Sequence, residues 1–209
     1  MTTVLIADDQ EMVRVGFRMI LAAEDGIEVV GEAADGPSAI EAIRRLRPDV
    51  ALLDIRMPHL DGLEVTAQVS EETAVVVVTT FGDEHSVDTA LENGAVGFIV
   101  KDSGPALLVS AVRAAAQGDA LISPELTLPL LRRRAAATPG GAEELEVLSE
   151  RELDVARLVA RGRTNAEIAS ELFLALSTVK SHLSHIQQRL NLRNRVEVAA
   201  MMWRHGAVS

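Results

Sequence analysis

The chain of 209 residues lacks cysteine and tyrosine and has only one tryptophan and four phenylalanines. Without cysteine, the protein has no disulfides, no zinc–thiolate sites and no cysteine nucleophile. Because aromatic residues make up 2% of the chain and hydrophobic residues 48%, its core must be aliphatic, as in many helical or α/β proteins. No apolar run approaches the ~20 residues that span a bilayer, and residues 1–10 lack the features of a signal peptide. We therefore expect a cytoplasmic protein with no membrane partner.

The acidic charge of the chain, −11 in total, is unevenly distributed. Residues 1–144 carry 11 Lys and Arg against 24 Asp and Glu, a net −13, whereas residues 145–209 carry 9 against 7, a net +2. A uniformly acidic protein would repel nucleic acid, but within 161–195 six basic residues stand against two acidic ones. This asymmetry indicates two domains with different partners.

Short apolar runs alternate with amphipathic helical patterns in residues 1–122. The expected strands are 3–7, 27–33, 50–53, 74–79 and 97–100, and the expected helices are 10–23, 37–46, 62–69, 84–93 and 104–117. Strands that alternate with helices indicate parallel βαβ units, and continuous apolar runs such as Val75–Val78 indicate a sheet covered on both faces. We expect an α/β doubly wound, five-stranded parallel sheet of the flavodoxin-like type, in which ligands bind at the carboxyl ends of the strands.

A second, wholly helical pattern follows in residues 145–209. Residues 123–144 are expected to join the two domains, with one helix at 124–134 and a flexible linker at 135–144, which is rich in Ala, Gly and Pro. The helical domain is expected to contain four helices, at about 150–160, 165–172, 178–190 and 195–204.

Capping residues support these helix positions. Ser149 with Glu152, and Thr164 with Glu167, have the spacing of capping boxes. Ser177 is expected to be the N-cap of the third helix. The short gap before that helix predicts a helix, a tight turn and a second helix over about 165–184.

Polar residues follow four of the five expected strands at the point where each strand ends. Asp8 and Asp9 follow the first strand and Asp54 the third, while Thr79 and Lys101 follow the fourth and fifth. Because parallel strands end at one edge of a sheet, we expect these side chains to converge. Clustered carboxylates need a cation, and an all-oxygen site suits Mg²⁺. A carboxylate in such a site is able to serve as the nucleophile in phosphoryl transfer.

Four motifs resemble those of receiver domains in two-component response regulators: "ADD" (7–9), "LLDIRMPHLDG" (52–62), "VVVVTTF" (75–81) and "GAVGFIVKD" (94–102). The second half of the chain resembles the DNA-binding domain of the LuxR/NarL type, so the resemblance covers the whole chain. It implies a DNA-binding transcription regulator that a histidine kinase phosphorylates.

The resemblance also implies a role for each residue of the acidic edge. Asp54 would accept the phosphoryl group, and Lys101 would contact it. Thr79 and Phe98 would form a switch pair, in which Phe98 moves inward after phosphorylation. The ligands of Mg²⁺ would be Asp8, Asp9, Asp54 and the backbone carbonyl of Arg56. Asp61, which follows in the same loop as Asp54, is expected to be a turn residue only.

The third helix of the second domain is expected to read DNA. Val179, Leu183, Ile186 and Leu190 form an apolar stripe on it, so the opposite face is available to a partner. The second helix of a helix-turn-helix enters the major groove, where its early residues meet base edges. The expected base contacts are Lys180, Ser181 and Ser184, and the expected phosphate contacts are Thr178, His182, Arg189, Arg193 and Arg195.

A serine at 184, where a basic residue would bind DNA more tightly, indicates a modest DNA affinity for one subunit. We therefore expect a homodimer after phosphorylation. The apolar run 196–203, which ends in Trp203, is either a dimer surface or core packing.

Two other functions remain open. A haloacid dehalogenase-like phosphatase also uses an aspartyl nucleophile, but it has a second acid where this chain has Arg56. A receiver that binds DNA constitutively would have little need of an intact acidic edge.

Overall fold

The structure, a computed structural model, describes residues 1–80, 84–122, 145 and 147–205. The chain divides into two compact units, residues 1–127 and 128–209. The helix expected at 124–134 and the linker expected at 135–144 lie outside the described residues. None of the helices in the described part of the chain is both long and apolar enough to cross a membrane.

The first unit contains the expected parallel sheet. Its strands are β1 (Thr2–Ala7), β2 (Ile27–Ala33), β3 (Val50–Asp54), β4 (Ala74–Thr79), β5 (Gly97–Val100) and β6 (Leu121–Ile122). They lie in the order β2-β1-β3-β4-β5-β6, and every neighbouring pair is parallel. The five expected strands are confirmed. The sequence did not reveal β6, because two residues are too few to show a periodicity.

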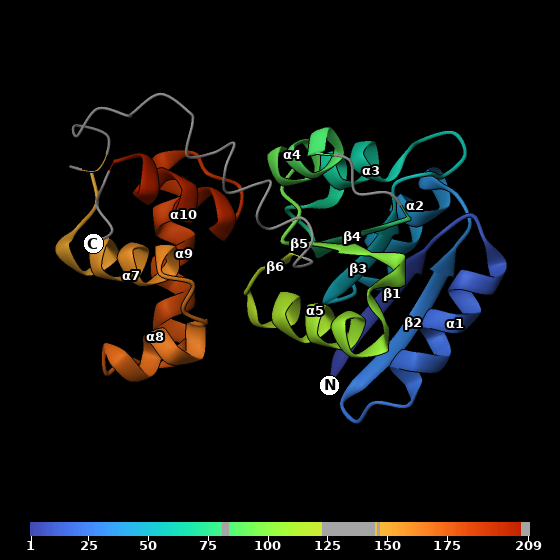
Figure 1. Ribbon diagram of the computed structural model, residues 1–209, viewed down its shortest axis with the longest axis horizontal. Coiled ribbons are helices and arrows are strands. Elements are labelled where there is room, and N and C mark those ends of the chain that lie inside the picture. Colours follow the sequence, from blue (N-terminus) through green and yellow to red (C-terminus); the bar gives the residue numbers. More distant parts are fainter. Residues whose placement is uncertain (81–83, 123–144, 146, 206–209) are drawn as a thin grey trace. The chain divides into compact units, whose positions relative to one another are not determined.

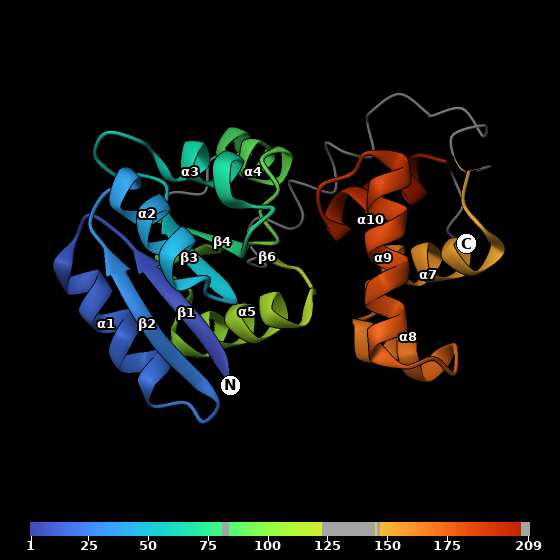
Figure 2. The same cartoon turned by 180° about the vertical axis from the view of Figure 1, so that it is seen from behind.

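Helices cover both faces of this sheet (Figures 1 and 2). They are α1 (Glu11–Ala22), α2 (Gly36–Leu46), α3 (Gly62–Val69), α4 (Glu84–Glu92) and α5 (Pro105–Gln117), with a short 3₁₀ helix, η1 (Lys101–Ser103), before α5. α1 and α5 lie on one face, and α2, α3 and α4 lie on the other. All five residues of β3 are buried, which explains why that strand reads as a continuous apolar run up to Asp54.

Within its described residues, 145 and 147–205, the second unit contains the four expected helices. They are α7 (Glu150–Ala160), α8 (Asn165–Glu171), α9 (Leu176–Leu190) and α10 (Arg195–Arg204). Both capping boxes form, at Ser149 with Glu152 and at Thr164 with Glu167. The aliphatic core includes Val155, Ile168, Val179, Ile186 and Met202.

The predicted N-cap of α9 is wrong. The helix begins at Leu176, so Ser177 lies in its first turn, and the N-cap is Ala175, whose backbone is extended. Alanine has no side-chain oxygen, and no side-chain hydrogen bond caps this helix. A serine near a helix start is a common cap, but here the backbone becomes helical two positions earlier than that residue type indicates.

Replacing Ala175 by serine is expected to stabilise the second unit by about 1 kcal/mol, because the new hydroxyl would accept a hydrogen bond from a first-turn N–H group. The single tryptophan, Trp203, lies in this unit and reports its unfolding by fluorescence. The matched control is Ala175→Val, which offers no acceptor and should not stabilise the unit. Equal unfolding midpoints for the serine and valine variants would contradict the expectation.

Candidate functional site

The carboxyl ends of β1 and β3 bring three aspartates together. These two strands are neighbours at the centre of the sheet, where the strand order reverses its direction and where ligands bind in open α/β folds. Asp8 and Asp9 follow β1, and Asp54 is the last residue of β3. One carboxylate oxygen from each lies within 4.8 Å of the others. The convergence expected from strand ends is therefore present.

Local hydrogen bonds hold Asp8 in the cluster. Its Oδ1 accepts a hydrogen bond of 2.9 Å from the N–H of Gln10, and its carbonyl accepts one of 2.7 Å from Arg14 Nη1. Asp8 and Asp54 are buried, at 1% and 4% exposure, whereas Asp9 is exposed. The cluster thus has a fixed inner part and one carboxylate that faces solvent.

Lys101 connects the two buried aspartates. Its Nζ lies 2.6 Å from Asp8 Oδ2 and 3.0 Å from Asp54 Oδ2, and its side chain is only 7% exposed. Burial by itself lowers the pKa of Lys101, but the hydrogen bonds to Asp8 and Asp54 outweigh it and hold the pKa above its ordinary value of 10.5. The lysine is therefore a permanent cation at the end of β5.

Burial raises the pKa of the Asp54 carboxyl above its ordinary value of 3.8. The hydrogen bond from Lys101 opposes this rise, the charge of Asp8 adds to it, and a hydrogen bond from the Arg56 backbone N–H opposes it. The ionised form of Asp54 is thus costly in this site unless a cation compensates it.

The donor set fits a hard divalent cation. Three carboxylates and one ammonium leave two negative charges uncompensated within a few ångströms, and all the available ligand atoms are oxygens. Such a set suits Mg²⁺ better than a softer metal, which prefers nitrogen or sulfur ligands. Asp8, Asp9 and Asp54 are the described residues whose carboxylates would hold it.

The two members of the expected switch pair lie on neighbouring strands. Thr79 ends β4, one residue beyond Val78, which pairs with Asp54, and it is buried, whereas Thr80 is exposed. Phe98 in β5 is fully buried. Because the ring of Phe98 is already inside the core, this structure does not contain the outward position from which the expected inward movement would begin.

The loop that follows Asp54 returns closely to it. Asp61 is the N-cap of α3 in a capping box with Glu64, as expected of a turn residue. The N–H of Gly62 donates a hydrogen bond of 2.9 Å to the carbonyl of Ile55. A Cβ on Gly62 would lie 2.1 Å from the carbonyl oxygen of Asp54, a distance that no side chain tolerates. Gly62 therefore allows the loop to pack against the backbone of the nucleophile candidate.

Replacing Gly62 by alanine is expected to cost about 2 kcal/mol of stability and to displace the backbone of Asp54, because the new methyl group clashes with backbone and not with a flexible side chain. The control is Gly16→Ala in α1, where nothing lies within 4 Å and the change should instead stabilise the helix by about 0.5–1 kcal/mol. Urea unfolding of both variants measures the difference. A Gly62→Ala protein as stable as wild type would show that the close approach is unimportant.

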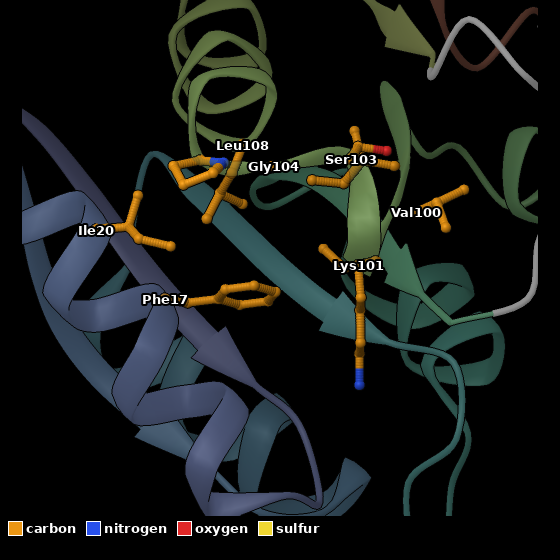
Figure 3. A pocket seen from close by; sticks show the side chains of 10 residues that line it. Phe17, Ile20, Val100, Lys101, Ser103, Gly104 and Leu108 are labelled. Atoms are coloured by element: carbon orange, nitrogen blue, oxygen red, sulfur yellow. The ribbon is translucent and has the colours of Figure 1, made fainter.

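The cavity beside Lys101 is too small and too apolar for a substrate. It measures about 80 Å³ and is lined mainly by apolar side chains of α1, β5 and α5, among them Phe17, Ile20 and Leu108 (Figure 3). The Lys101 side chain runs past it, with its nitrogen at the end far from Ser103 and Gly104. This cavity gives no support to the phosphatase alternative.

The second unit presents one polar face of α9. Val179, Leu183 and Ile186 are buried as expected, and Leu190 is half-buried. The expected base contacts Lys180, Ser181 and Ser184 are exposed, as is Arg193, while Thr178 and His182 are half-buried. The start of α9 therefore offers short polar side chains and one lysine to a partner.

Arg195 is not on this face, and its expected DNA contact needs correction. The residue is buried, at 8% exposure, and its guanidinium donates to Asn165 Oδ1 and to the carbonyl of Arg163. These acceptors lie about 30 positions earlier in the chain, at the start of α8. The sequence shows the charge of an arginine but not the interior acceptors that hold it.

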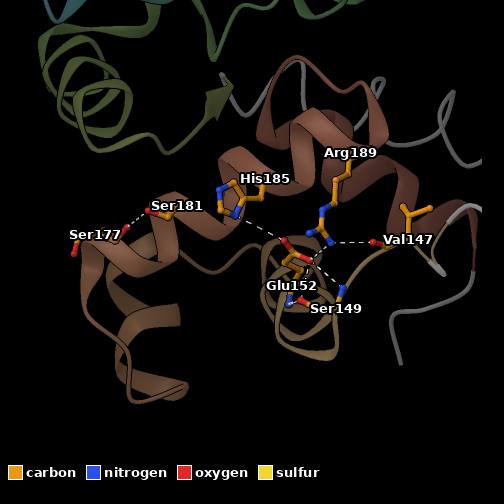
Figure 4. A network of polar contacts seen from close by, with 7 residues as sticks. All are labelled: Val147, Ser149, Glu152, Ser177, Ser181, His185 and Arg189. Atoms are coloured by element: carbon orange, nitrogen blue, oxygen red, sulfur yellow. Dashed lines mark hydrogen bonds and ion pairs between the residues drawn. The ribbon is translucent and has the colours of Figure 1, made fainter.

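Arg189 also has an internal partner that the sequence did not reveal. Its Nη1 lies 2.9 Å from Glu152 Oε2 and 3.0 Å from the carbonyl of Val147 (Figure 4). Glu152 accepts hydrogen bonds from the N–H and Oγ of Ser149 as well. The capping-box pattern identified Glu152 as a cap, but not as the link between α7 and α9.

The sequence predicts that the segment 196–203 is either a dimer surface or part of the core, and Trp203 has features of both. Its side chain is largely exposed, at 58%, yet its Nε1 donates a hydrogen bond of 2.9 Å to the carbonyl of Ala160. Val198 and Met202 in the same helix are buried in the core. The helix therefore contributes to the core and leaves the tryptophan ring at the surface.

Comparison with known proteins gives a consistent result. Residues 4–113 match the model of the response regulator receiver domain, and residues 146–202 match that of the bacterial regulatory proteins of the luxR family. The oxygen regulatory protein NreC of Staphylococcus carnosus (strain TM300) is 38% identical over 203 residues, which cover 93% of this chain and 94% of NreC. The transcriptional regulatory protein LiaR of Bacillus subtilis (strain 168) is 36% identical over 212 residues and the full length of both chains.

Solved structures are similar as well. The crystal structure of the response regulator ChrA from a heme-sensing two-component system has 33% identity and a TM-score of 0.54, with 99% of this chain and 98% of ChrA covered. A LuxR-family two-component response regulator from Aurantimonas sp. SI85-9A1 has 29% identity and a TM-score of 0.61, with 64% of this chain and 97% of that chain covered.

Proposed function

Because this chain belongs to the LuxR-type two-component response regulators, we propose that phosphorylation of Asp54 controls its binding to promoter DNA. Its family is one of transcription regulators and not of hydrolases. The observation that carries the proposal is the cluster of Asp8, Asp9, Asp54 and Lys101 on a chain that also contains a helix-turn-helix domain. We place the protein in the cytoplasm, where both a histidine kinase and DNA are available to it.

The proposed chemistry is the transfer of a phosphoryl group from a phosphohistidine to Asp54. A carboxylate oxygen of Asp54 forms the new O–P bond while the N–P bond breaks, and the leaving imidazole nitrogen takes a proton from water. Asp8, Asp9, Asp54 and the backbone carbonyl of Arg56 would hold Mg²⁺, which when bound would neutralise the negative charge around the phosphoryl oxygens.

Lys101 has the central electrostatic role among the residues of this chain. A phosphoryl group on Asp54 adds negative charge beside Asp8, so it needs an ammonium nearby to be tolerated. Lys101 already contacts both aspartates and could move from Asp8 to a phosphoryl oxygen without crossing the site. Thr79, at the end of the neighbouring strand β4, would offer its hydroxyl to another of these oxygens.

The second unit then binds DNA through α9. Lys180, Ser181 and Ser184 are the proposed base contacts, and Thr178, His182 and Arg193 are the proposed phosphate contacts. Arg195 leaves this set because it is buried and internal acceptors hold it. Arg189 stays in the set as a phosphate contact, because half of its side chain is exposed although it also pairs with Glu152. Phosphorylation is proposed to favour a homodimer, whose two copies of α9 would meet two half-sites.

The test compares DNA binding with and without a phosphoryl mimic. Beryllofluoride with Mg²⁺ mimics the acyl phosphate, and fluorescence anisotropy of a labelled duplex, selected by the mimic-treated protein from a random-sequence pool, measures the affinity. Tighter binding with the mimic is the expected result. Equal affinity in both states would favour the constitutive DNA-binding protein instead.

A further inference from the structure

Phe173, in the turn between α8 and α9, combines two features that seldom occur together. Its backbone has a φ of +55°, in the left-handed region that a bulky residue rarely adopts, and its side chain is 95% exposed. The position follows the end of α8, where glycine or asparagine is the usual residue. The corresponding end of α9 has asparagine, Asn191, at a φ of +52°.

The surrounding structure holds Phe173 in this conformation. The N–H of Phe173 donates to the carbonyl of Ser170, and the N–H of Leu174 donates to the carbonyl of Ala169 at 2.8 Å. Arg151 from α7 donates to the carbonyl of Leu172. Leu172 and Leu174 pack against the core on either side, so the phenylalanine between them is directed outward. The ring thus contributes little to the packing of the domain, and glycine, which has no Cβ, would relieve the backbone strain.

From this geometry we propose that Phe173 contacts DNA: its ring packs against apolar sugar or base-methyl groups at the edge of the groove that α9 enters. The proposal rests on the proposed DNA binding through α9. Two residues lie between Phe173 and Leu176, the first residue of the helix, so the two Cα atoms are three chain steps and at most about 11 Å apart. Leu176 is also exposed, at 42%, and we call Phe173 and Leu176 together the apolar edge.

The charges of the residues around Phe173 favour DNA as the partner of its ring over an acidic or mixed protein surface. Residues 172–190 contain no aspartate or glutamate but include Lys180 and Arg189. The exposed side chains next to the apolar edge are Ser177, Lys180 and Ser181, which are suited to phosphates and base edges. Apolar contact between a phenylalanine and a thymine methyl group is an established mode of recognition in the major groove.

The experiment uses the full-length chain and three variants. Phe173→Gly removes the ring and the strain together, Phe173→Tyr keeps the ring, and Lys180→Ala removes a proposed base contact. The probe is a short duplex that the wild-type protein selects from a random-sequence pool. Affinity is measured by anisotropy, and the melting of the second unit is measured through the fluorescence of Trp203.

Opposite changes in affinity and stability are the expected result for Phe173→Gly. Its DNA affinity should fall about tenfold, as expected when roughly half of an aromatic side chain is no longer buried on binding. Its melting midpoint should rise by about 4 °C, because the left-handed conformation is no longer strained. Phe173→Tyr should bind as the wild type does. Replacing thymine by deoxyuridine distinguishes a base-methyl contact, which would be weakened, from a sugar contact, which would not.

Two results would overturn the proposal. Wild-type affinity of Phe173→Gly, together with weak binding by Lys180→Ala, would leave DNA binding through α9 intact and assign the ring to another partner. A joint loss of affinity and stability in Phe173→Gly would give the ring a structural role. If Lys180→Ala also bound normally, the proposed function of α9 would itself be wrong.

Discussion

Replacing Asp54 by asparagine is expected to abolish the incorporation of phosphate and, with it, any gain in DNA affinity on phosphorylation. The amide has nearly the same shape as the carboxylate but lacks the nucleophilic oxygen that forms the O–P bond. The removal of one charge from the cluster should leave the fold intact, because burial disfavours the ionised form of Asp54. Incubation with Mg²⁺ and a radiolabelled small phosphoryl donor, such as acetyl phosphate, measures incorporation directly.

The matched control for this variant is Asp61→Asn. Asp61 lies in the same loop but acts as the N-cap of α3, a role that asparagine fills equally well. This control should take up label at the wild-type level. Label on the Asp54→Asn protein, or its absence from Asp61→Asn, would contradict the assignment of the two aspartates.

Replacing Glu152 by alanine is expected to cost the second unit about 2–3 kcal/mol, because it removes a helix cap and one partner of a partly buried ion pair. Glu152 is 3% exposed and connects Ser149 at the start of α7 with Arg189 on α9 (Figure 4). Without it, the Ser149 N–H and the guanidinium lose an acceptor. Urea unfolding followed by Trp203 fluorescence measures the loss.

The stability supplied by Glu152 should also depend on pH. Burial by itself raises the pKa of its carboxyl, but the hydrogen bonds from Ser149 and the charge of Arg189 hold the pKa below its ordinary value of 4.5. A lowered pKa in the folded state means that the stabilisation is complete above pH 4.5 and is lost as the pH falls below it. The wild-type protein should therefore lose stability in this range, and Glu152→Ala should lose less.

Glu150→Ala is the control for both effects, because Glu150 is exposed in the same first turn of α7. We expect it to cost less than about 1 kcal/mol, through the helix dipole alone. If the two variants lost equal stability, the link between α7 and α9 would have no energetic importance.

The site at the sheet edge could be predicted because it depends on topology. Once the strands were identified as parallel, Asp8, Asp54 and Lys101 had to meet at one edge, and they do. The ion pair of Lys101 with Asp8 could not be predicted, because the choice between two acceptors depends on side-chain geometry. The full burial of Phe98 likewise depends on packing around β5 that no local pattern describes.

The errors in the second unit share a physical cause. The charge of Arg195 predicts a DNA contact, but its partners, Asn165 and the carbonyl of Arg163, are distant in sequence. The residue type of Ser177 predicts a cap, but the backbone becomes helical at Leu176. Tertiary contacts and backbone dihedral angles determine these outcomes, and a single sequence carries little information on either.

The most direct test of the central claim is to locate the phosphoryl group on the wild-type chain. After incubation with Mg²⁺ and acetyl phosphate, borohydride reduces an aspartyl phosphate to homoserine, and peptide mass spectrometry identifies the position. We predict homoserine at position 54 and at no other aspartate. Homoserine at Asp8, Asp9 or Asp61, or a stable phosphate ester on a serine or threonine, would contradict it.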